Sequence, residues 1–129
     1  MRLVVLVLNL PWTFVGIVAG LLSVPKSVHL SSRPIAVVLN VRSFWWYEWL
    51  PGKAGVRAMT IGHIVLVGPN YLKRDLAHEL IHVEQYEQEP FIYPLLYGLQ
   101  SLRHGYRQNK YEVEAYDKSG SEYIDASQS

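Results

Sequence analysis

The chain contains no cysteine among its 129 residues, so any metal site must use histidine and carboxylate ligands rather than thiolates. The same absence removes disulfides as an indicator of the cellular compartment. The net charge is only +1, which gives no reason to expect a nucleic acid as partner. Internal repeats and low-complexity tracts are also missing. The composition therefore predicts a small globular protein with a single main core.

Charged side chains are absent from residues 3–24, near the N-terminus. As a helix, residues 3–24 would be about 33 Å long, enough to cross the hydrocarbon core of a bilayer. We therefore expect residues 1–25 to be the transmembrane anchor of a single-pass membrane protein, followed by residues 26–129 as its one small globular domain. A cleaved signal peptide and a buried or re-entrant helical hairpin broken at Pro11 are the alternatives. The positive-inside bias favours a cytoplasmic location for residues 26–129.

Two later segments also suit a membrane setting. Residues 44–50 hold three of the four tryptophans, a composition typical of the headgroup interface. Residues 91–99 are apolar but too short to span a bilayer, so they are either core or an interfacial helix. For both segments, burial within the domain is at least as good an interpretation, because aromatic clusters are common in cores.

The segment from His78 to His82 reads HELIH, which on a helix places two histidines on one face, one turn apart. Both imidazoles can then reach a single Zn²⁺ ion. Glu79, about 100° further round the helix, can take a proton from a water molecule without binding the metal itself. The helix is bounded by a turn at residues 68–70 and by Pro90. The pattern predicts metal-assisted hydrolysis; the alternative is an exposed helix with two unrelated histidines.

A catalytic zinc ion normally takes three protein ligands, so a third must come from elsewhere in the chain. The predicted helix near residues 110–119 carries three carboxylates. Glu112 and Glu114 lie about 200° apart around this helix, so only one of them can face the metal. Glu114 has a lysine four residues away on either side, as in a solvated charge ladder. We therefore predict Glu112 as the third ligand, with Asp117 as the next candidate.

HELIH together with the later Glu112-Val113-Glu114-Ala115 resembles the HExxH…ExxA signature of gluzincin metallopeptidases, especially small bacterial members and the membrane-bound CAAX-type proteases. The resemblance covers residues 57–117 at most and implies that Glu112 binds zinc. It also implies a zinc metalloendopeptidase whose partner is a peptide or protein substrate. The strand before the metal helix would then pair with extended peptide. Tyr116 stands where the family often has an aspartate.

Four further residues are candidates for contacts with the substrate or the transition state: Gln85, His104, Tyr106 and Arg107. Gln85 lies on the face of the two histidines, where it could bind a ligand or simply occupy the helix edge. The other three precede the glutamate helix and are of the types that can donate a hydrogen bond to a developing oxyanion.

The predicted order of elements is a membrane helix, strands near residues 34–42 and 57–67, the metal helix near 71–88, an apolar helix near 91–103 and the glutamate helix near 110–119. This order predicts an α+β fold in which a short antiparallel sheet packs on a helical layer, as a small zincin-like domain.

The sequence thus predicts a membrane-associated zinc metalloprotease. The alternative is a zinc-binding membrane protein that is not an active protease and uses the site for stability or for binding a partner. Because structural zinc sites usually have four protein ligands, a fourth side chain such as His104 or Asp117 on the metal would favour this alternative.

Overall fold

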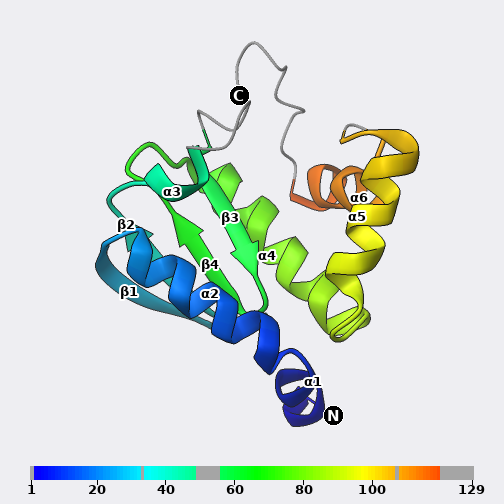
Figure 1. Cartoon of the computed structure of the whole chain (residues 1–129), viewed down its shortest axis with the longest axis horizontal. Coiled ribbons are helices and arrows are strands. Elements are labelled where there is room, and N and C mark those ends of the chain that lie inside the picture. The colour runs from blue at the N-terminus through cyan, green and yellow to red at the C-terminus, as the bar shows by residue number, and fades with distance from the viewer. Residues whose placement is uncertain (1, 33, 49–55, 107, 120–129) are drawn as a thin grey trace.

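A computed structural model describes residues 2–32, 34–48, 56–106 and 108–119 of the chain. Within these ranges the protein has an α+β fold with one four-stranded sheet and six helices, which confirms the predicted class (Figure 1). The elements in chain order are α1 (Arg2–Leu8), α2 (Leu10–Leu22), β1 (Pro25–Ser32), β2 (Ile35–Val41), α3 (Trp45–Glu48), β3 (Ala58–Ile61), β4 (Ile64–Val67), α4 (Lys73–Gln88), α5 (Tyr93–His104) and α6 (Lys110–Ser119).

The sheet is mixed, with the strand order β1-β2-β4-β3. β1 and β2 are antiparallel, as are β3 and β4, but β2 and β4 run parallel, so the prediction of an antiparallel sheet is wrong at this pair. The reason is that the chain enters the sheet again at its far edge, through β3. The apolar strand β4, buried along its whole length, then fills the central position beside β2.

The segment 57–67, predicted as one strand, is a hairpin. Its turn is at Gly62, which has a φ of +64°, a backbone conformation that glycine adopts without strain. A side chain at Gly62 would also collide with the backbone of Thr13 in α2. A two-residue turn inside an apolar segment leaves little trace in the hydrophobic pattern, which explains why it was predicted as a single strand.

The single helix predicted over residues 3–24 is also not observed. It is divided into α1 and α2 at Asn9, which is fully buried. The Asn9 side chain donates to the carbonyl of Tyr86 at 2.9 Å and accepts from the N–H of Phe91 at 2.8 Å, so the chain is fastened here to the end of α4. Among the residues that the structure describes, no helix is long and apolar enough to cross a membrane.

The core lies on both faces of the sheet. On one face, Ala19 of α2 and Phe44 pack against Ile64 and Leu66 of β4. On the other face, Val83 of α4 packs against Val65 and Val67 of β4 and against Ala36 and Val38 of β2. α2 and α4 therefore cover opposite faces of the sheet, and β4 is apolar throughout because it is buried on both sides.

A third cluster, formed by tyrosines of α4, α5 and α6, extends the core beyond the sheet. Tyr86, Tyr93 and Tyr111 are each at most 6% exposed. They join α4, which the sheet positions, to the two C-terminal helices. Figure 1 shows that α5 runs away from the end of α4, with α6 beside it. α6, the predicted glutamate helix, packs on α4, the predicted metal helix.

Candidate metal centre

The metal helix α4 is positioned by its first turn. The carboxylate of Asp75 accepts from the N–H of Leu72, which precedes the helix, at 2.8 Å. The same carboxylate receives two hydrogen bonds of 2.9 Å from Arg57, just before β3. This two-point contact of a guanidinium with a carboxylate fixes both distance and orientation. It therefore holds the start of α4 beside the edge strand β3.

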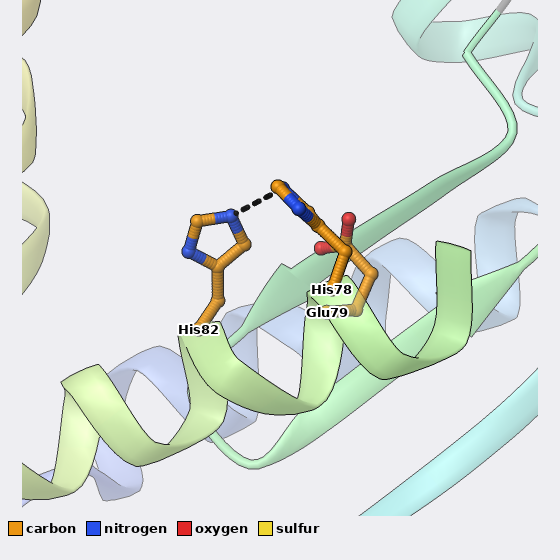
Figure 2. Close-up of side chains that lie close together, drawn as sticks. All are labelled: His78, Glu79 and His82. Carbon is orange, nitrogen blue, oxygen red and sulfur yellow. Dashed lines mark hydrogen bonds between the residues drawn. The ribbon is translucent and has the colours of Figure 1, made fainter. Parts of the chain in front are cut away.

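His78 and His82 project from the same side of α4, as the sequence predicted (Figure 2). Both are buried, and their Nε2 atoms lie 3.1 Å apart. Glu79 lies beside them, and the ligand atoms of the three residues are within 4.8 Å of one another. Two imidazole nitrogens that point at the same space while buried are the arrangement expected of a pair of metal ligands.

Glu112 of α6 brings its carboxylate to the two histidines. Its Oε1 lies 2.9 Å from Nε2 of His78 and 3.1 Å from Nε2 of His82, so the three atoms form a nearly equilateral triangle. Ligands in a tetrahedral Zn²⁺ site are separated by about 3.3 Å when each is about 2.0–2.1 Å from the ion. A small widening of the triangle would therefore accommodate the ion, and these three residues could hold Zn²⁺.

The other two carboxylates of α6 do not approach the histidines. Asp117 is exposed. Glu114 forms an ion pair with Lys118 at 3.5 Å, as expected for a charge ladder, and its other oxygen accepts from Gln85. Glu112 is buried together with Ala115 and Tyr116, on the face of α6 that packs on α4.

Electrostatics couple Glu112 to His82. Burial alone would raise the pKa of Glu112, but hydrogen bonds to His78 and His82 outweigh it and hold this pKa below its ordinary value. Burial also opposes protonation of His82, yet its hydrogen bond to Glu112 and the charges of Glu112 and Glu79 raise its pKa to about 9. In the metal-free protein a proton on His82 therefore compensates the buried carboxylate.

Gln85 positions His82 from behind. Its Oε1 lies 2.8 Å from Nδ1 of His82, and its Nε2 donates to the carbonyl of Tyr111 and to Glu114, each at 2.8 Å. Because both of these partners are acceptors, the amide nitrogen faces them and the amide oxygen must face His82. Nδ1 of His82 then keeps its hydrogen, and Nε2 is the nitrogen that can bind a metal ion once it has released its own proton.

Tyrosines surround the remaining sides of the site. The Tyr97 hydroxyl donates a short hydrogen bond to Oε2 of Glu112. The Tyr93 hydroxyl donates to Gln85 at 3.0 Å and lies 3.1 Å from Nδ1 of His82. The Tyr116 ring lies 4.3 Å from the ring of His78. The sequence gives no sign of the contacts of Tyr93 and Tyr97, because their segment has the pattern of an ordinary apolar helix.

Glu79 is held by Thr60 of the edge strand β3. The Thr60 hydroxyl lies 2.7 Å from Oε1 of Glu79 and 3.0 Å from its backbone carbonyl. Thr60 was also missed, because nothing in the sequence near it indicates a role beyond strand formation. Its contact ties the orientation of the Glu79 carboxylate to the strand that borders the site.

A cavity of about 510 Å³ opens onto these groups. His78, Glu79, His82 and Glu112 form its polar end. Side chains from α3 and from the segment around β3 form an apolar wall: Trp46, Tyr47, Val56, Met59 and Ile61. The cavity thus has three groups that could bind one metal ion, and beside them the carboxylate of Glu79. It also has space for a ligand.

Of the four residues predicted to contact the substrate or the transition state, the structure places one in the cavity wall. Tyr106 lines the cavity, and its hydroxyl lies 2.9 Å from that of Tyr116. His104 is exposed at the end of α5 and is not among the residues that line the cavity. Gln85 is buried behind His82 rather than in the cavity wall. Arg107 lies outside the described residues.

Comparisons with known proteins add no family to this geometry: no protein-family model, curated protein or solved structure matches the chain.

Proposed function

We propose that this chain is a zinc-dependent metallopeptidase of the gluzincin kind that hydrolyses peptide bonds. The observation that carries the proposal is the convergence of His78 Nε2, His82 Nε2 and Glu112 Oε1 within 3.1 Å, next to Glu79 and an open cavity. Two imidazoles and one carboxylate form the ligand set of many catalytic zinc sites, in which a fourth position stays open.

The proposed roles follow from the positions of the side chains. A bound Zn²⁺ would supply Lewis acidity, polarising a carbonyl oxygen and making water more acidic. Glu79 would act as general base towards water and later pass the proton to the leaving amine. Thr60 would keep the Glu79 carboxylate in the orientation that this transfer needs.

Tyr106 is the best placed of the predicted donors to an oxyanion. It lines the cavity, whereas His104 is exposed and is not among the lining residues. Tyr106 is about half-exposed, yet partial loss of water around its hydroxyl and the negative charge of Glu112 raise its pKa, so that the phenol keeps its proton and can donate. A donor of this kind contributes most where charge develops in the transition state.

The edge strand β3 would bind the peptide. In the described sheet it pairs with β4 on one side only, and its residues line the cavity next to Glu79. An extended peptide can add to such an edge through main-chain hydrogen bonds, with side chains entering alternate pockets. The apolar wall at Trp46, Met59 and Ile61 would favour an apolar substrate side chain.

The alternative, a zinc site that serves only stability or partner binding, would require a fourth protein ligand. Both candidates for this position, His104 and Asp117, are exposed, which supports the catalytic proposal. The burial of His78, His82 and Glu112, each at most 7% exposed, favours the alternative, because it restricts access to the ion.

The test begins with zinc content per chain in the purified protein. Near-stoichiometric zinc that is lost in Glu112→Ala but retained in Glu114→Ala supports the site. Hydrolysis of casein, followed by mass spectrometry, is then measured for the wild type, for Glu79→Gln and for Glu84→Gln, a control for charge loss on α4. Zinc in all three with hydrolysis lost only in Glu79→Gln supports the peptidase. Stoichiometric zinc without hydrolysis in the wild type supports the alternative, and no zinc in a folded wild type excludes both.

A further inference from the structure

The N-terminal helices expose large apolar side chains instead of burying them. Leu3 of α1 is 72% exposed, and Phe14 and Leu21 of α2 are 67% and 66% exposed. α2 contacts the sheet through three small residues, Gly16, Ala19 and Gly20, so that its large side chains face outward. Residues 3–24 contain no charge that would solvate this surface.

α5 carries a second exposed apolar stripe. Ile92, Leu95, Leu99 and Leu102 follow one another at intervals of three or four residues, which places them on one face of the helix. Each of them is at least 44% exposed, and Leu102 is 87% exposed. Residues 91–102 are also without charge.

The two apolar regions meet where α1 and α2 join. The indole N–H of Trp12 donates to the carbonyl of Phe91 at 2.7 Å, and the two rings lie 6.2 Å apart. Asn9 binds the N–H of Phe91 from the same junction. These contacts join the segment before α5 to the junction of α1 and α2, and we call the exposed apolar side chains of the three helices together the α1–α2–α5 surface. Apolar patches of this extent on a protein surface usually mark an interaction site.

Charge along the chain indicates what this surface binds. The chain has no Asp or Glu before Glu48, and none between Pro90 and Glu112. These two acid-free segments contain the whole α1–α2–α5 surface and seven of the twelve Lys and Arg residues of the chain. All eleven acidic residues lie elsewhere or at the segment boundaries. This segregation complements a negatively charged layer, because an anionic bilayer attracts basic residues beside an inserted apolar surface.

Tryptophans stand at both ends of α2. Trp12 lies in its first turn. Trp45 is 54% exposed, and its N–H donates to the carbonyl of Leu22, the last residue of α2, at 2.7 Å. Tryptophan is enriched at the headgroup level of membranes, where its ring is buried and its N–H stays in a polar layer.

We propose that the α1–α2–α5 surface binds the interfacial layer of an anionic lipid bilayer, with α2 lying along the membrane plane. Because the small residues of α2 hold it on the sheet, only its outer side inserts, as in amphipathic helices that lie in a membrane surface. Apolar insertion and basic residues such as Lys26 and Arg103 then act together. This proposal concerns a surface apart from the metal centre and does not depend on hydrolysis.

One consequence does rest on the proposed peptidase function. Pro94 and Tyr97 of α5 line the cavity, while Leu95 and Leu99 of the same helix belong to the bilayer-binding surface. Binding to a membrane would therefore place the cavity next to the lipid surface. Peptide segments close to a membrane would be the substrates that reach it most readily.

The experiment measures partition of the purified protein onto vesicles by sedimentation. Vesicles of phosphatidylcholine alone are compared with vesicles that also contain phosphatidylglycerol, at low and high salt. We expect binding to the anionic vesicles that weakens with salt. The double variants Phe14→Gln/Leu21→Gln and Leu95→Gln/Leu99→Gln should each bind at least about tenfold more weakly, because each removes two inserted apolar side chains.

The matched control is Leu72→Gln. Leu72 is 45% exposed and precedes α4, about 24 Å along that helix from the junction with α5, so its replacement should leave binding unchanged. Circular dichroism and zinc content establish that each variant is folded. Glu79→Gln should bind vesicles like the wild type, so loss of hydrolysis and loss of membrane binding are separable.

Three outcomes would overturn the proposal. The wild type could fail to bind either kind of vesicle, or Leu72→Gln could weaken binding as much as the two double variants. Light scattering could also show a wild-type oligomer that both double variants convert to a monomer without any vesicle binding, in which case the α1–α2–α5 surface joins copies of this chain.

Discussion

Nδ1 of His82 lies 2.8 Å from the amide oxygen of Gln85. Both residues belong to α4, but Gln85 is oriented by α6, so α6 orients His82 through Gln85. The amide group of Gln85 is oriented by two acceptors, the Tyr111 carbonyl and the Glu114 carboxylate. Glu114 thus helps to orient Gln85 although it faces away from the two histidines, and the Tyr111 carbonyl still orients the amide when Glu114 is replaced. The pair of helices carries both the ligands and the contacts that orient one of them.

Replacing Gln85 by leucine should weaken zinc binding by about tenfold to a hundredfold, the range typical for loss of a contact that orients a metal ligand. Leucine fills a similar volume but cannot accept the hydrogen of Nδ1, so the ring of His82 loses its fixed orientation. The measurement is competition with a chromophoric chelator. Gln88→Leu, an exposed change near the end of the same helix, is the control and should not alter the affinity. Unchanged affinity in a folded Gln85→Leu protein would contradict the role of this contact.

Thr60 provides a prediction about Glu79 that also depends on the proposed hydrolysis. Thr60→Val keeps the shape and the β-branched character of the side chain but removes the hydroxyl that lies 2.7 Å from the Glu79 carboxylate. We expect kcat to fall by about tenfold to a hundredfold, with zinc content unchanged, because only the proton-transferring group is misplaced. Thr60→Ser restores the hydroxyl and should recover most of the activity. Equal activity in the valine and serine variants would show that Glu79 does not need this contact.

The histidine pair and Glu112 could be placed from the sequence because helix geometry is local. HELIH needs only one turn of helix to bring two imidazoles together. The choice of Glu112 over Glu114 needs only the angle between them and the lysines four residues to either side of Glu114. Thr60, Tyr93 and Tyr97 could not be found in this way. Their hydroxyls reach the site from other elements, and no short pattern marks a tyrosine in an apolar helix as a partner of a carboxylate.

The same difference between local geometry and contacts from distant segments explains why parts of the fold were predicted wrongly. Hydropathy predicts one helix over residues 3–24 because Asn9 is one of only a few polar residues in a long apolar segment. The groups that bind its side chain belong to Tyr86 and Phe91, 77 and 82 residues away along the chain. The hairpin at Gly62 was missed for the opposite reason: β4 is buried on both faces, so the alternation that would separate two strands is absent.

Asn9 itself should be important for stability. Asn9→Ala removes both side-chain hydrogen bonds and leaves the N–H of Phe91 and the carbonyl of Tyr86 without these partners, which should lower the free energy of unfolding by about 2–4 kcal/mol. Asn70→Ala, an exposed change before α4, should have an effect within about 0.5 kcal/mol. Urea denaturation of the metal-free proteins compares the two. A loss of stability in Asn9→Ala no larger than in Asn70→Ala would mean that the helix break is not anchored by this side chain.

Zinc binding should compete with a proton on His82. The negative charge of Glu112 and its hydrogen bond outweigh burial and raise the pKa of His82 from 6.5 to about 9, so in the metal-free protein the imidazole is protonated at pH 7. Zinc needs the neutral ring, and binding must therefore release this proton. The apparent affinity should rise with pH, by up to about tenfold per unit, and level off near pH 9.

The stability of the metal-free fold should change with pH in the opposite direction to the zinc affinity. Because the pKa of His82 is higher in the folded than in the unfolded chain, its contribution is fully present below about pH 6.5 and is lost as the pH rises through about 9. Chelator competition and thermal melting, each measured across this range, test both trends. His29→Gln, an exposed change on β1, should leave them intact, whereas His82→Gln should abolish them. A zinc affinity that is independent of pH between 6.5 and 9 would show that no proton is displaced, and that His82 faces Glu112 as a neutral ring even without metal.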